Sequence, residues 1–94
     1  MREVIFTSRF KKDFKREKSS EHRLFLNSNE FTNVLTLLRT DTPLAEKYCD
    51  HAMKGQFKGL RNCHLRPDLV LLYELPDKNT VVLVRMGSHS QLGI

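Results

Sequence analysis

Three apolar segments lie close together in the second half of the chain, and two short polar segments separate them. The apolar segments cover about residues 57–65, 69–75 and 80–86, and the middle one reads Leu-Val-Leu-Leu-Tyr-Glu-Leu. β-Branched and aromatic side chains in segments of this length predict strands. The connections, Arg66-Pro67-Asp68 and Pro76-Asp77-Lys78-Asn79, consist of turn residues. Because links this short cannot contain a crossover, we expect the three strands to pair antiparallel.

The first 20 residues predict a strand and a basic helix. Residues 2–7 alternate in β-branched and aromatic side chains, which is typical of a strand. A helix over about 8–18 follows, and Ser8 is a candidate cap. Phe10 and Phe14 lie one turn apart in this segment and give it an amphipathic face.

A second helix is expected to begin near Asn27 and to end near Asp41. Asn27 and Glu30 have the spacing of a capping box, and Pro43 disfavours continuation of the helix. Apolar residues then recur at helical spacing, which predicts one buried face. They are Phe31, Val34, Leu35 and Leu38.

The elements predict an α+β fold in the order β-α-α-β-β-β, with two helices on one face of a mainly antiparallel four-stranded sheet. Residues 42–55 are expected to form a loop, with one turn of helix near Ala45–Cys49. The apolar residues in the stretch 21–26 either extend one of the two helices or pack in the connection between them. Residues 1–94 are expected to form one small domain whose other sheet face is free for function.

Positive charge is concentrated in two segments of a chain whose net charge is +5. Residues 1–20 carry +4 and residues 51–68 carry +3, whereas residues 21–50 carry −2. Basic regions attract nucleic acid, anionic lipid or acidic protein, although ordinary solubility is the alternative. With no apolar run of about 18 residues and no signal-peptide pattern at the N-terminus, we expect a cytoplasmic protein without membrane contact.

The two cysteines, Cys49 and Cys63, are too few for a disulfide framework. Together with His51 and His64 they form the one conceivable zinc ligand set, but their spacing matches none of the usual zinc patterns. We therefore expect no metal and no cofactor.

Three of the four histidines, His51, His64 and His89, lie in two short stretches near basic side chains. Imidazoles exchange protons near neutral pH, and cationic side chains bind phosphate. Alternate residues of a strand share a face, so Asn62 and His64 are expected on one side of their strand and Arg61 on the other. These residues are candidates for a phosphodiester site, although each histidine also fits a plain surface position.

The histidines and Asp68 lie near the ends of predicted strands, which favours their coming close together in the fold. Asp68 lies across the tight turn from His64, where a carboxylate either orients the ring or only begins a turn. His51 precedes the sheet and His89 follows its last strand, and these two ends converge in an antiparallel sheet. His22 stands alone in a polar segment, and we assign no role to it.

Metal-free RNA cleavage requires a base for the 2′-OH proton, an acid for the leaving 5′-oxygen and cations for the crowded phosphorane. His51 and His89 are candidates for the proton transfers. Phe57 either stacks on a base or packs in the core. The candidates for contacts with RNA or phosphate are Lys54, Phe57, Lys58, Arg61, Asn62, Arg66 and Arg85.

Four motifs occur in a characteristic order along the chain. They are Asp50-His51, Gly55-Gln56-Phe57-Lys58-Gly59-Leu60-Arg61, His64-Leu65-Arg66-Pro67-Asp68 and Gly87-Ser88-His89. With these motifs, the chain resembles the YafQ branch of the RelE/ParE superfamily of bacterial type II toxins over nearly its whole length. The resemblance implies a RelE-like fold.

The resemblance also implies a ribosome-dependent endoribonuclease that enters the ribosomal A site and cuts mRNA without a metal. A cognate antitoxin would neutralise it, and operator DNA would be bound only by the toxin–antitoxin complex. By match to the family's positions, His51, His64, Asp68 and His89 are catalytic. The preferred roles are His51 as general base, His89 as general acid, and His64 with Asp68 orienting groups and contacting phosphate, although these roles can be exchanged.

Two positions depart from the family pattern. Asn62 stands where a known member has an acidic residue, and an amide cannot take a proton at neutral pH. Gly93 stands where that member has an aromatic residue, so stacking there is missing unless Phe57 or Tyr73 substitutes. The alternative functions are a non-catalytic ParE-like toxin that binds gyrase or the ribosome, and a plain RNA-binding module. The histidines argue against the ParE-like branch.

Overall fold

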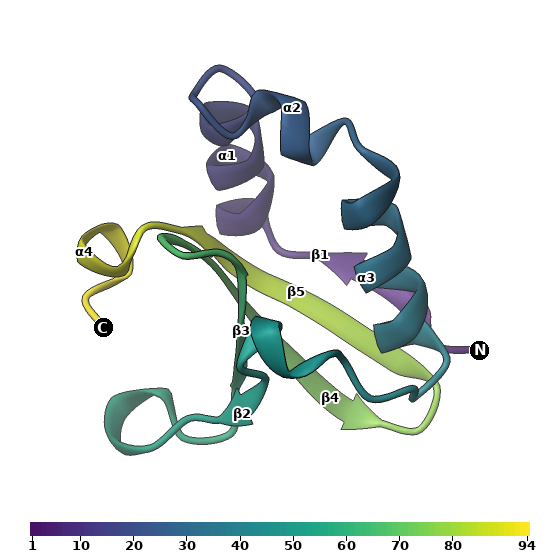
Figure 1. Cartoon of the computed structure of the whole chain (residues 1–94). Coiled ribbons are helices and arrows are strands. Elements are labelled where there is room, and N and C mark those ends of the chain that lie inside the picture. Colours follow the sequence, from purple (N-terminus) through teal and green to yellow (C-terminus); the bar gives the residue numbers. More distant parts are fainter.

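The computed structural model describes residues 1–94 and has the α+β architecture that the sequence predicted. Figure 1 shows α1, α2 and α3 on one side of the sheet and α4 apart from them, near the C-terminus. The short helices α2 and α4 were not predicted. In chain order, the elements are β1 (Glu3–Phe6), α1 (Ser8–Glu17), α2 (Arg23–Leu26), α3 (Asn29–Arg39), the 3₁₀ turn η1 (Glu46–Tyr48), β2 (His51–Ala52), the 3₁₀ turn η2 (Gly55–Phe57), β3 (Arg61–Arg66), β4 (Leu69–Asp77), β5 (Thr80–Gly87) and α4 (His89–Leu92).

The strands form one sheet in the order β1-β5-β4-β3-β2. β1 pairs in parallel with β5, and all other neighbours are antiparallel. The prediction of four strands was wrong by one, because the loop 42–55 contains the short strand β2, in which His51 pairs with Asn62. Two residues are too few to produce an alternating pattern in the sequence. This pairing brings His51 to the edge of the sheet.

The strand β3 begins later in the chain than predicted because two glycines before it adopt turn conformations. This strand begins at Arg61 and not at residue 57, because Gly55–Phe57 form the turn η2. Gly55 and Gly59 have φ values of +68° and +99°, which glycine adopts readily and which interrupt an extended strand. The segment with Lys54 and Lys58 is therefore a loop beside the sheet.

Side-chain caps fix where the two long helices begin. Thr7, and not Ser8, caps α1 and accepts a backbone hydrogen bond at 3.0 Å. Ser28, and not Asn27, caps α3. The predicted capping box of Asn27 with Glu30 was therefore wrong by one position, and the Glu30 side chain reaches another element instead. None of the helices combines the length and the apolar composition needed to cross a bilayer.

The main core lies between the sheet and the helices α1 and α3, which cover one face as predicted. On the opposite face, a smaller apolar cluster of Val70, Leu72 and Leu92 attaches α4 to the sheet. Phe57 packs against this cluster, so its ring contributes to packing. The opposite face is therefore partly covered and not fully free.

Side chains of α1 complete the hydrogen bonding of the β5 edge beyond the end of β1. Asp13 is buried and accepts hydrogen bonds from the Met86 amide at 3.1 Å and from Arg85 Nε at 2.7 Å. Arg16 donates to the Met86 carbonyl and to Asp13, both at 2.9 Å. Burial alone would raise the pKa of Asp13, but the hydrogen bonds from Arg85, Met86 and Arg16 lower it below its ordinary value. An ionised carboxylate therefore joins α1 to the sheet.

Candidate active site

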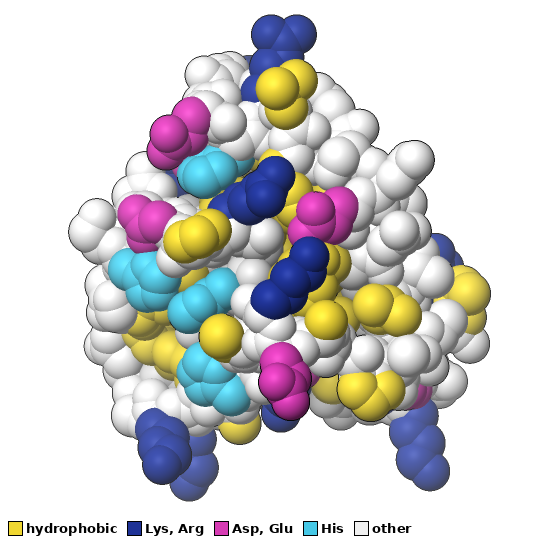
Figure 2. Space-filling model, in the orientation of Figure 1, with side chains coloured by type: hydrophobic (Ala, Val, Ile, Leu, Met, Phe, Trp, Pro, Cys, Tyr) yellow, Lys and Arg dark blue, Asp and Glu magenta, His cyan; other side chains and the backbone are white.

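The structure brings His51, His64 and His89 together on the face opposite α1 and α3. His51 pairs with Asn62 across the sheet, and paired residues share a sheet face. Asn62 and His64 are two residues apart in β3 and also share a face. His51 and His64 therefore lie on the same face. The ring of His89 meets His64 edge-on, with ring centroids 5.0 Å apart. Figure 2 shows histidine side chains gathered on one face of the molecule.

Asp68 binds His89 and not His64. Its Oδ1 accepts a hydrogen bond from the His89 amide at 3.0 Å and lies 2.7 Å from His89 Nδ1. These hydrogen bonds from the His89 backbone and ring lower the pKa of Asp68, which stays ionised. The capping box of Ser88 and Gln91 holds the first turn of α4 in place. The expectation that Asp68 orients His64 was wrong, because α4 brings its own N-terminus to the β3–β4 turn.

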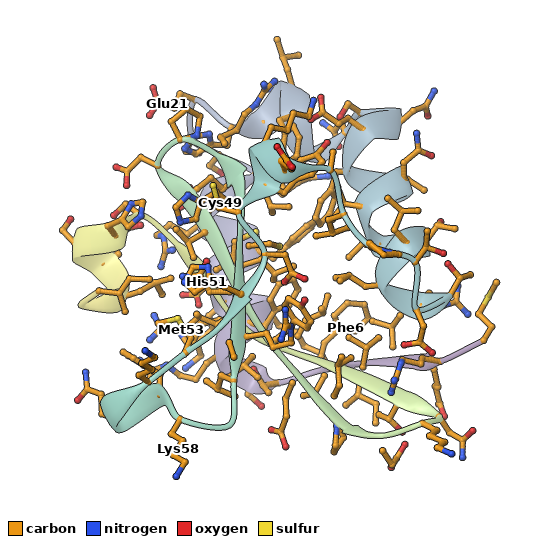
Figure 3. All side chains as sticks on the ribbon, turned by 60° about the horizontal axis from the view of Figure 1, so that its bottom comes forward. Phe6, Glu21, Cys49, His51, Met53 and Lys58 are labelled. Carbon is orange, nitrogen blue, oxygen red and sulfur yellow. The ribbon has the colours of Figure 1, made fainter.

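A backbone carbonyl fixes the tautomer of His51. Its Nδ1 lies 2.6 Å from the carbonyl oxygen of Cys49, which can only accept, so Nδ1 carries a proton. Neutral His51 then has its lone pair on Nε2. Cys49 adopts a left-handed conformation with φ of +48° and lies two residues before His51, close to it in Figure 3. His51 is thus arranged to accept a proton through Nε2.

His64 lies between its neighbours in a partly buried position. Burial lowers the pKa of His64, and the positive charges of His89 and His51 lower it further. This imidazole is therefore neutral near pH 7. A neutral ring has one N–H donor and one acceptor nitrogen.

We expect His64 to make the folded protein less stable in mild acid. Its folded-state pKa lies below the ordinary value of 6.5, so the unfolded chain binds more protons as the pH falls through 6.5 towards the folded value, and stability is lost there. Urea unfolding between about pH 7 and 5 should show a smaller loss for His64→Gln than for the unchanged protein. His22→Gln is the matched control, and parallel curves for the His64→Gln variant and the unchanged protein would contradict this expectation.

Three of the predicted cations are not paired with carboxylates in the structure. Lys54 and Lys58 flank η2 with exposed side chains, and Lys58 extends away from the body of the protein in Figure 3. Arg66 is exposed at the end of β3, and its guanidinium lies 4.7 Å from the centre of the Phe25 ring. These side chains retain N–H donors for an anionic ligand.

Arg61 anchors the loop before β2 and does not face the histidines. Its Nη2 donates to Asp50 at 3.1 Å, and its Nε donates to the Tyr73 hydroxyl at 3.2 Å. The Tyr73 hydroxyl also donates to Asp50. Because Asp50 directly precedes His51, this network fixes the backbone that carries the imidazole. Sequence reasoning missed Asp50 and Tyr73, although Tyr73 lies opposite Arg61 in the predicted hairpin.

Asn62 and Arg85 lie on the histidine face, where Asn62 is buried and Arg85 is bound to a carboxylate. Asn62 is buried, and its Oδ1 has no hydrogen-bond partner. Two nitrogens of Arg85 bind Asp13 at 2.7 and 3.2 Å. Position 62 therefore offers no ionisable group, and two of the three nitrogens of the Arg85 guanidinium are bound to Asp13 and not to a ligand.

The aromatic position that the family resemblance implied is filled by the end of α4. Gly93 has φ of +73° at this helix end, a conformation that favours glycine. Tyr73 cannot replace the missing ring because it is buried on the opposite face. Phe57 is partly buried and retains some exposed surface near the site.

His22 borders the histidine group, although its isolated position in the sequence indicated no role. Its charge is close enough to Asp68 to contribute to the lowered pKa of that carboxyl. Its Nε2 lies 3.8 Å from Glu21 and 4.0 Å from Glu17. No three His, Cys, Asp or Glu side chains are placed to bind a metal ion.

Comparisons with known proteins agree with this geometry. A family model described as "Bacterial toxin of type II toxin-antitoxin system, YafQ" matches residues 2–93. The mRNA interferase toxin YafQ of Escherichia coli K12 is 34% identical over 92 residues, which cover 97% of this chain and 95% of the relative. The crystal structure of YafQ from E. coli BL21(DE3) has a TM-score of 0.79 and 30% identity, with 98% of each chain covered.

A solved complex provides a third comparison. A chain of the E. coli DinJ–YafQ toxin–antitoxin complex has a TM-score of 0.77 and 30% identity, with 97% of this chain and 96% of that chain covered. The family match and the identity extend over nearly the whole chain, as do the structural similarities. The chain therefore belongs to the YafQ family of bacterial type II toxin–antitoxin toxins.

Proposed function

We propose that this toxin is an endoribonuclease that cuts mRNA on the ribosome by metal-free acid/base transesterification. The E. coli relative named an mRNA interferase supports the reaction class. The observation that carries the chemistry is that two imidazoles on one face have different hydrogen-bond partners, which suit one to accept a proton and the other to donate one. The Nδ1 of His51 donates to the Cys49 carbonyl, which leaves the lone pair of the neutral ring on Nε2, and His89 has a carboxylate partner.

The reaction requires two proton transfers. Nε2 of His51 takes the proton of the ribose 2′-OH, and the 2′-oxygen forms a bond to phosphorus. The bond between phosphorus and the 5′-oxygen breaks, and protonated His89 gives its Nε2 proton to that oxygen. Asp68 stabilises the imidazolium form of His89 through Nδ1. The products are a 2′,3′-cyclic phosphate and a 5′-OH.

Other side chains stabilise the charge of the phosphorane. Neutral His64 donates its N–H to a phosphate oxygen, and Lys54, Lys58 and Arg66 provide positive charge. No step in this scheme uses a metal or a cofactor.

The partners follow from this role. The E. coli DinJ–YafQ complex supports a cognate antitoxin for this chain. A toxin of +5 net charge suits an acidic antitoxin segment that folds on binding. We further propose that operator DNA is bound only by the toxin–antitoxin complex and that the toxin acts in the cytoplasm, where mRNA is translated.

Expression of the toxin without its antitoxin tests the proposal. Mapping of RNA 5′ ends should find new 5′-OH ends inside translated messages and none in the same messages when their translation is blocked. Intact messages together with DNA damage would favour a ParE-like toxin that binds gyrase. Intact messages with the protein on ribosomes would favour a binding module without nuclease activity.

Tyr73→Phe is expected to slow cleavage by about tenfold through His51. The variant removes the hydroxyl that joins Asp50 to Arg61, and small displacements of a catalytic group cost large factors in rate. The measurements are single-turnover cleavage and its pH profile, with the fold checked by circular dichroism. Asp50→Asn should have a similar effect, and a folded Tyr73→Phe variant with unchanged rate would show that His51 is held without this network.

A further inference from the structure

A pocket of about 250 Å³ opens beside the histidine group. It lies where the first turn of α3, the turn η1 and the end of β3 meet, and His64 lines one side. The remaining polar lining comes from Glu30, Lys47, Tyr48 and Arg66. The proposed reaction uses His64 and the charge of Arg66 but gives no role to the rest of this lining.

Glu30 places a carboxylate acceptor in this pocket. The Tyr48 hydroxyl donates to Glu30 Oε2 at 2.8 Å, and Lys47 Nζ lies 3.6 Å from the same oxygen. No protein donor binds Oε1. The hydrogen bond from Tyr48 lowers the pKa of Glu30, so the carboxyl is ionised and acts only as an acceptor at neutral pH.

Arg66 provides hydrogen-bond donors and positive charge at the pocket rim, whereas Glu30 provides an acceptor. The guanidinium of Arg66 lies over the Phe25 ring and makes no hydrogen bond to the protein. Its planar set of N–H donors is therefore available to a ligand. A planar guanidinium of this kind suits a phosphate oxygen. The pocket therefore joins a phosphate donor, an acceptor and a catalytic imidazole.

We infer that this pocket binds the nucleotide next to the scissile phosphate and selects a base with an exocyclic amino group. Glu30 accepts the amino N–H of cytosine, adenine or guanine, whereas uracil has no amino group and offers a carboxylate only its single ring N3–H. Arg66, at the pocket rim beside His64, binds the scissile phosphate of that nucleotide. This inference rests on the proposed ribonuclease function, for which it names a specificity determinant.

Glu30→Gln tests the inference because glutamine both donates and accepts. Cleavage is measured on translated messages that differ only in the nucleotide flanking the cut. The unchanged toxin should prefer amino-bearing bases over uracil by about tenfold, and Glu30→Gln should largely abolish this preference. Glu46→Gln, a nearby exposed carboxylate outside the pocket, should keep the preference. Arg66→Gln should reduce cleavage of all messages alike.

A binding measurement separates failure of the inference from failure of the proposed function. Cytidine and uridine 5′-monophosphate are titrated into the free toxin, and the amide signals of residues 30, 47 and 48 are followed by NMR. The cytidine nucleotide should bind more tightly, and Glu30→Gln should remove the difference even if the toxin cuts no RNA. Equal binding of both nucleotides, or an unchanged sequence preference in Glu30→Gln, would overturn the inference.

Discussion

Replacing His89 with alanine is expected to reduce RNA cleavage by about 10²- to 10⁴-fold, the usual contribution of a positioned general acid. The variant removes the one imidazole of the histidine group that is within hydrogen-bond distance of a carboxylate, at 2.7 Å from Asp68. The leaving 5′-oxygen would then have to depart without a proton. The measurement is single-turnover cleavage of a translated message with ribosomes and purified toxin.

Two features make this test of His89 selective. The His89 backbone amide still binds Asp68, and the Ser88–Gln91 capping box remains, so α4 should fold in the variant. His22→Ala removes a histidine that borders the group without entering the reaction, and it should cut within about threefold of the original rate. If His89→Ala cleaves as fast as the unchanged toxin, another group must protonate the leaving oxygen.

Asp13→Ala is expected to lower the free energy of unfolding by about 3 kcal/mol. The side chain is buried and binds Arg85, Arg16 and the Met86 amide. Removal leaves the Arg85 guanidinium and the Met86 amide without this acceptor, whereas Arg16 keeps its bonds to the Met86 carbonyl and to Glu17. For a chain of this size, such a loss is a large part of the total stability. Urea unfolding at pH 7 measures it.

The effect of Asp13 should depend on pH. Because its folded-state pKa is lowered from 3.8, its contribution is fully present above that value and is lost as the pH falls below it towards the folded-state value. The stability gap between the unchanged toxin and Asp13→Ala should therefore narrow at strongly acid pH. Glu3→Gln, an exposed carboxylate without an ion pair, should change stability by less than about 0.5 kcal/mol. A comparable loss in both variants would show that Asp13 has no special role.

Much of the fold could be predicted because its signals are local. The apolar periodicity of α3, from Phe31 to Leu38, and the short turns at Pro67 and Lys78 each depend on a few neighbouring residues. Their combination leaves few possible arrangements of helices on an antiparallel sheet. The strand β2 could not be predicted in this way, because its two residues extend only through pairing with β3.

The side-chain partners of the site were much less predictable. Asp68 was expected beside His64, but the unpredicted turn of α4 brings His89 to it instead. Arg61 was a candidate ligand for RNA, and the structure binds it to Asp50 and Tyr73 on the other face. In each case, the partner comes from a different element of the fold.

The amino-acid sequence by itself determined the order of the longer helices and strands, the concentration of positive charge and the supply of imidazoles near the ends of strands. Those properties follow from local backbone preferences and from composition. Only the tertiary structure decided which carboxylate binds which imidazole, which nitrogen of His51 is free and which arginines are occupied by Asp13 and Asp50. The carboxylate partners depend on distances between residues far apart in the chain, and the His51 tautomer depends on the left-handed backbone at Cys49, two residues away. These distances and this backbone geometry exist only once the sheet and α4 are in place.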